Sequence, residues 1–95
     1  MTLQEFKNTF DQAQPPQDLS IFLQSLWFDG VGNWKQAHDL VDNRGGQEAA
    51  HIHAYLHRVE GDFGNARYWY NRAGQPYCEA SLEQEWEQLF HKFNT

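Results

Sequence analysis

The sequence has little of several features on which other classes of protein depend. Its single cysteine, Cys78, cannot form an internal disulfide, so we expect a reducing compartment. A chain of 95 residues leaves room for one domain only. The N-terminal residues show neither the basic segment nor the apolar run of a signal peptide, and no apolar stretch approaches the ~20 residues of a membrane span. We therefore expect a cytoplasmic protein that does not cross a membrane.

Basic residues and catalytic motifs are also scarce. Seven Lys and Arg residues stand against thirteen Asp and Glu residues, which gives a net charge of −6. Without a basic stripe, nucleic-acid binding lacks its electrostatic driving force. The sequence contains no glycine-rich phosphate loop, no G-x-S-x-G motif and no clustered CxxC. We accordingly assign no catalytic residue and no cofactor, and an enzyme is the less favoured interpretation.

What the sequence does have is aromatic residues, 16% of the chain, arranged with the periodicity of helices rather than strands. Thr2 and Glu5 form a capping box, Pro15-Pro16 ends the first helical pattern, and Asp18 is the expected N-cap of the second. These signals predict an all-α fold of about six helices in three antiparallel αα-hairpins. The expected helices span residues 3–13, 18–29, 33–43, 47–60, 63–73 and 79–93.

The chain divides into three parts within this single domain. Residues 1–16 form an N-terminal helix and proline break, residues 18–76 hold two hairpins, and residues 77–95 form a C-terminal capping helix. The last helix is the most amphipathic, and its stripe is too large to leave in water. We expect it to cover the fifth helix or to form a homodimer interface. The stripe consists of Leu82, Trp86, Leu89, Phe90 and Phe93.

The two central hairpins repeat one local pattern. Gly32-Asn33-Trp34 and Gly61-Asp62-Phe63 stand 29 positions apart, and the same spacing relates Ala37 to Ala66. In each copy a glycine ends one helix, a polar residue caps the next, and an alanine lets the paired helices approach closely. The pattern resembles the tetratricopeptide repeat, although its spacing is shorter than the usual 34 residues or so. The small residues expected opposite the two alanines are Ser25 and Ala54.

A narrower resemblance covers about 22 residues, from His53 to Gly74. The run H-A-Y-L-H-R, followed by E-G-D, N-A, Y-W-Y and R-A-G, is similar to a group of small bacterial proteins to which no function is assigned. The resemblance implies a bacterial cytoplasmic setting. It supplies no site residues.

Histidines provide the main candidates for chemistry. His53 and His57 share one flank of the fourth helix with Glu60, whereas His51 lies on the opposite flank, and His38 lies one hairpin earlier. The favoured interpretation is packing or ligand contact without a metal ion. The alternative is a metal site formed by His53 and His57 with His38 or Glu60 as the third ligand, because two histidines four residues apart can ligate one ion.

Two arginines and a tryptophan complete the candidate ligand-binding residues. Arg58 and Arg67 suit a carboxylate or another anion, although such charges commonly form solvated salt bridges. Trp69 belongs to Tyr68-Trp69-Tyr70, three consecutive rings that a helix points in three directions. The sequence therefore predicts a non-catalytic module that binds a peptide, a protein or a small ligand. The alternative is a small metal-binding protein or enzyme. The favoured binding residues are His38, His53, His57, Arg58, Arg67 and Trp69.

Overall fold

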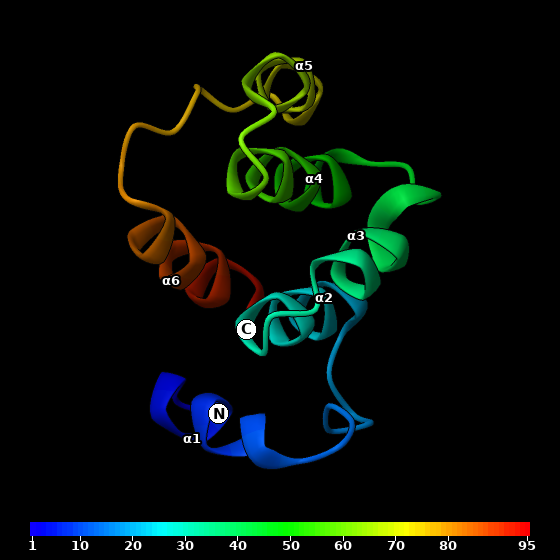
Figure 1. Ribbon diagram of the computed structural model, residues 1–95, viewed down its shortest axis with the longest axis vertical. Coiled ribbons are helices and arrows are strands. Elements are labelled where there is room, and N and C mark those ends of the chain that lie inside the picture. The colour runs from blue at the N-terminus through cyan, green and yellow to red at the C-terminus, as the bar shows by residue number, and fades with distance from the viewer.

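The computed structural model describes residues 1–95 and confirms an all-helical fold (Figure 1). It contains six α-helices, one short 3₁₀ helix and no strands. None of the helices has the length and apolar character that crossing a membrane requires. The elements are α1 (Leu3–Asn8), η1 (Thr9–Asp11), α2 (Ile21–Gly30), α3 (Trp34–Asp42), α4 (Gln47–Val59), α5 (Phe63–Ala73) and α6 (Leu82–Phe93).

Side-chain caps set where most helices begin. The expected capping box at Thr2 and Glu5 is present, and Ser81 forms another at the start of α6. The expected start of the second helix was wrong, since Ser20 rather than Asp18 accepts the backbone N–H bond that caps α2. Likewise α6 begins at Leu82, not at residue 79, because its cap is Ser81. The first helix is also shorter than expected, since η1 takes over at Thr9.

The pairs α2/α3 and α4/α5 form hairpins in which small residues meet. Ala37 and Ala66 are both fully buried, as are the residues expected opposite them, Ser25 and Ala54. The Ser25 hydroxyl donates a hydrogen bond of 2.8 Å to the carbonyl oxygen of Ala37, which ties α2 to α3. The two alanines therefore lie where the helices of a hairpin touch.

The turns within the two hairpins have matching backbone geometry. Gly32 and Gly61 adopt positive φ angles of 85° and 80°, a conformation that glycine tolerates best. The next residues, Asn33 and Asp62, cap α3 and α5 through their side chains. Their backbone N–H groups each bond to the carbonyl five residues earlier, at 2.8 Å and 2.9 Å. One turn design therefore occurs twice.

Helix α6 closes the molecule from the side opposite α3 (Figure 1). Its buried residues Trp86, Leu89 and Phe90 pack against α1, α2 and α4 rather than over α5. The expectation that α6 covers the fifth helix was therefore wrong, because a long linker after α5 carries the chain back to the first hairpin. The third helix pair joins α1 to α6, and the chain ends meet where Asn94 donates a 2.6 Å hydrogen bond to the Met1 carbonyl.

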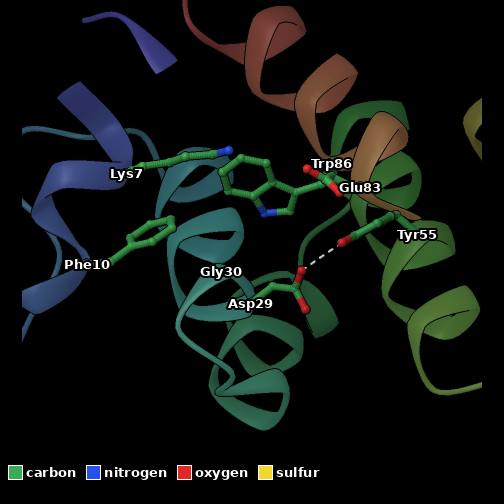
Figure 2. Close-up of a pocket in the computed structure, with 7 residues that line it drawn as sticks. All are labelled: Lys7, Phe10, Asp29, Gly30, Tyr55, Glu83 and Trp86. Carbon is green, nitrogen blue, oxygen red and sulfur yellow. Dashed lines mark hydrogen bonds between the residues drawn. The ribbon is translucent and has the colours of Figure 1, made fainter. Parts of the chain in front are cut away.

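A pocket of about 220 Å³ opens where α1, η1, α2, α4 and α6 converge (Figure 2). It lies beside α6, away from the α3/α4 interface. Three aromatic rings, two carboxylates and one ammonium group contribute to its wall. The lining residues are Lys7, Phe10, Asp29, Gly30, Tyr55, Glu83 and Trp86.

Candidate metal centre

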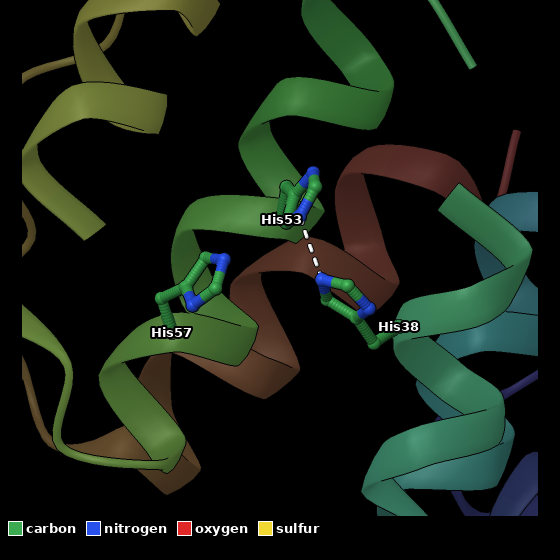
Figure 3. Close-up of side chains that lie close together, drawn as sticks. All are labelled: His38, His53 and His57. Atoms are coloured by element: carbon green, nitrogen blue, oxygen red, sulfur yellow. Dashed lines mark hydrogen bonds between the residues drawn. The ribbon is translucent and has the colours of Figure 1, made fainter. Parts of the chain in front are cut away.

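Three histidines from two helices come together at the α3/α4 interface (Figure 3). His38 lies on α3, and His53 and His57 lie one turn apart on α4. One ring nitrogen from each lies within 4.8 Å of the other two. The Nε2 atoms of His38 and His53 are 2.8 Å apart, so that one ring donates a hydrogen bond to the other. The flank that the spacing of His53 and His57 predicted thus faces His38 directly.

Aromatic rings hold the histidines in place. Trp34 stacks on His38, with ring centroids 4.8 Å apart and planes 14° from parallel. Trp69 stacks on His53 at 3.9 Å, and His53 stacks in turn on His57 at 5.0 Å. The Trp34 indole is itself fixed by a 2.7 Å hydrogen bond to the Leu56 carbonyl. These contacts restrict rotation of the imidazoles and shield them from water.

A carboxylate holds the ring nitrogen of His57 that points away from the other two histidines. The Nδ1 atom of His57 donates a 2.7 Å hydrogen bond to Glu60 at the end of α4. This bond places the proton on Nδ1 and leaves the Nε2 lone pair free to face the other two rings (Figure 3). Metal-binding histidines usually donate the N–H that does not touch the ion to a carboxylate, a backbone carbonyl or water.

A second carboxylate, that of Asp42, lies close to the two histidine rings that are bonded to each other. Oδ1 of Asp42, the last residue of α3, lies 3.8 Å from Nε2 of His38 and 3.9 Å from Nε2 of His53. Both distances are too long for hydrogen bonds but short enough for two ligands of one ion. Asp42 is therefore a candidate fourth ligand.

The environment keeps His53 neutral. Burial, followed by the neighbouring His38 and His57 rings, lowers the pKa of His53 to about 4, and Asp42 opposes the shift only in part. A neutral imidazole has the lone pair that a metal ion requires.

The donor set fits zinc with a small adjustment. Zinc–nitrogen bonds of about 2.0–2.1 Å in a tetrahedral site separate the ligand nitrogens by about 3.3 Å. The His38 and His53 nitrogens must move apart by about half an ångström, and the His57 nitrogen and Asp42 must move inward. The ring that donates from Nε2 must also carry its proton on Nδ1 instead, so that both Nε2 lone pairs face the ion. Imidazole and carboxylate groups are ordinary zinc ligands.

The remaining sequence candidates lie at different places. Trp69 belongs to the cluster through its stacking on His53, but Arg58 pairs with Glu85 at 2.6 Å and with the Ala80 carbonyl at 2.7 Å. Arg67 is exposed and lies over the Tyr77 ring on the linker. The structure therefore brings together four of the six candidates and separates both arginines from them.

Sequence reasoning missed Trp34 and Asp42 as members of the cluster. Both belong to the helix that carries His38, and each lies four residues from it, so the spacing that joined His53 to His57 could have found them. It also missed Asp29, Tyr55 and Trp86, whose convergence in a pocket depends on how α6 packs.

No protein-family model matches the chain, and searches of curated proteins and of solved structures find no similar protein.

Proposed function

We propose that this protein binds a divalent transition-metal ion, zinc above all, through His38, His53 and His57 with Asp42 as the fourth ligand. The observation that carries the proposal is the convergence of three imidazole nitrogens within 4.8 Å, one of them oriented by a carboxylate. Four protein ligands leave no open coordination position, which favours a structural or metal-carrying role over catalysis. Bound metal would fasten α3 to α4, and so one hairpin to the other.

Simple packing is the competing explanation for the cluster. Buried histidines often satisfy each other and nearby carboxylates, as His57 and Glu60 do here. Packing alone, however, needs only one acceptor for each buried N–H. The cluster additionally offers a free lone pair on His57 and an oxygen of Asp42 that reaches two rings without bonding to either.

Zinc titration of untagged, metal-stripped protein tests the proposal. We expect one zinc ion per chain, and cobalt should give the visible absorption of a tetrahedral site. Zinc at one hundred times its dissociation constant adds about 2.7 kcal/mol to the free energy of unfolding. That corresponds to a rise in melting temperature of roughly 10–20 °C for a domain of this size.

The double variant His53→Gln with His57→Gln should lose both the stoichiometric zinc and the rise in melting temperature. His51→Gln is the matched control, because His51 lies on the same helix but contacts Lys92. Equal zinc binding by the parent and the double variant would refute the proposal, as would a parent that binds no zinc. In the absence of metal, the double substitution should cost about 1–3 kcal/mol because it cuts a buried polar network.

Two further observations support a second function. In this function the protein is a tetratricopeptide-like module that binds a peptide, a protein or a small ligand. The hairpins α2/α3 and α4/α5 share one turn geometry, which suits a helical repeat. The pocket beside α6 offers a binding place that contains none of the three histidines. The two functions are therefore separable, and zinc-site variants should leave the pocket unaffected.

A further inference from the structure

The pocket beside α6 collects groups from elements far apart in the sequence (Figure 2). Lys7 and Phe10 come from the N-terminal segment, Asp29 from the end of α2, Tyr55 from α4, and Trp86 from α6. At about 30 Å³ for each water molecule, its volume of about 220 Å³ has room for about seven waters or a ligand of similar size.

Asp29 is a half-buried carboxylate without a cationic partner. Its Oδ2 atom accepts a 2.8 Å hydrogen bond from the Tyr55 hydroxyl, and no lysine, arginine or histidine nitrogen lies within 4.0 Å of it. Burial raises the pKa of Asp29, and the hydrogen bond from Tyr55 opposes that rise. Its other oxygen, Oδ1, accepts no hydrogen bond from the protein and is accessible to solvent. A half-buried charge without a counter-ion gains from a cation that reaches it.

The backbone adds to the negative potential at the same place. Helix α2 ends at Gly30, directly after Asp29, and a helix C-terminus carries a partial negative charge. Glu83 contributes a second carboxylate to the pocket wall. Two acidic side chains and a helix C-terminus therefore outweigh the single ammonium group of Lys7.

The aromatic walls suit the body of a cationic ligand. Phe10, Tyr55 and Trp86 all line the pocket, and aromatic faces attract ammonium groups as well as hydrocarbon. Lys7 already uses one of these faces, because its Nζ atom lies 5.8 Å from the centroid of a Trp86 ring. That ammonium pairs with Glu87 at 3.7 Å and forms no ion pair with Asp29.

We infer that this pocket binds a small alkylammonium ion. The ammonium group donates to Oδ1 of Asp29, and the short alkyl chain lies against Trp86 and Phe10. A primary ammonium fits better than a quaternary one, since the free carboxylate oxygen calls for an N–H donor. The inference is independent of the metal centre, because none of the pocket residues belongs to the histidine cluster.

Titration of the metal-free protein with n-butylammonium chloride, followed by amide and indole NMR signals, tests this. We expect saturable shifts centred on Trp86, Tyr55 and Gly30, and much weaker binding of 1-butanol, a neutral molecule of the same length. Asp29→Asn should weaken butylammonium binding about tenfold or more, because it removes a charge-assisted hydrogen bond. Asp39→Asn is the control, since it removes an equal charge from an exposed residue paired with Lys35.

Lys7→Met should change butylammonium affinity in the opposite direction to Asp29→Asn. A variant that merely lost structure would bind more weakly, so tighter binding excludes that explanation. Removing the resident ammonium frees the Trp86 face, and butylammonium should then bind several-fold more tightly. Butanol binding as tightly as butylammonium would overturn the inference, as would full affinity in Asp29→Asn or weaker binding in Lys7→Met. Equal weakening by Asp29→Asn and Asp39→Asn would also overturn it, since that result identifies attraction to the net charge alone.

Discussion

The two hairpins share a backbone design but use it for different chemistry. Asp29 and Arg58 occupy the same position, each three residues before the glycine of its turn and each bonded to it through its carbonyl. Arg58 in the second hairpin is paired with Glu85. Asp29 in the first has only the Tyr55 hydroxyl and lines the pocket.

The charge of Arg58 therefore holds the fold together, whereas the charge of Asp29 is available for binding. Glu85 is 2% exposed, accepts from Arg58, and receives the Tyr70 hydroxyl at 2.7 Å and 2.6 Å on its two oxygens, so it links α6 to both α4 and α5. Asp29 makes no comparable link. Near the start of α6, a fully satisfied network therefore lies beside an incomplete one, and incomplete polar sites are where ligands are expected.

The largest effect should come from breaking the complete network. Glu85→Ala removes the carboxylate partner of the Arg58 guanidinium and the acceptor of the Tyr70 hydroxyl, and we expect a loss of about 3–5 kcal/mol in the free energy of unfolding. Chemical denaturation measures it. Glu83→Ala is the control, because Glu83 lies on the same helix but is exposed, and it should cost little. Similar losses for the two variants would show that the network does not fasten α6.

The hairpin contacts should give the next largest effect. Ala37→Leu and Ala66→Leu each force a larger side chain into a fully buried contact, which costs roughly 1–3 kcal/mol. Thermal unfolding of both variants compares the two hairpins directly. Similar losses would support equivalent packing, whereas an unchanged melting curve for either would place that alanine away from the helix contact.

Much of the fold could be predicted because caps and breakers act locally. The helix limits followed from residues such as Asn33 and Gly61, whose influence reaches only a few positions along the chain. The docking of α6 could not be predicted, since an apolar stripe shows that a helix needs a partner but not which one. The path of the linker after α5, which leads back to the first hairpin, determines where α6 docks.

The candidate sites also divide into local features that the sequence predicts and long-range contacts that it does not. His53 and His57 are neighbours on one helix, so their spacing was enough to predict that they lie together. His38 was included as a candidate on the facing helix, and the structure places it beside them. Arg58 was expected to contact a ligand because nothing near it in sequence marks Glu85, 27 residues later, as its buried partner. Glu85 itself looks like a surface residue, since it precedes Trp86 in the charged first turn of α6. Contacts between distant helices depend on crossing geometry that periodicity does not encode.

The smallest effect, and the one most specific to Asp29, is a dependence of stability on pH. Because burial raises the pKa of Asp29 in the folded protein, its contribution to stability is present below the unfolded value of about 3.9 and is lost as pH rises through the folded value. Asp29→Asn keeps an acceptor for Tyr55 without the charge. The variant should therefore gain stability relative to the parent as pH increases from about 4 to 7.

Paired denaturation curves across that range measure the difference between variant and parent, in which the contributions of all other titrating groups cancel. Asp39→Asn should show no such gain, since Asp39 is exposed and bonded to Lys35. A difference that shrinks with rising pH would mean that Asp29 has found a cation within the chain, and Lys7 is the nearest candidate in the pocket wall. In that case the network beside α6 would already be complete, and the contrast between Asp29 and Arg58 would disappear.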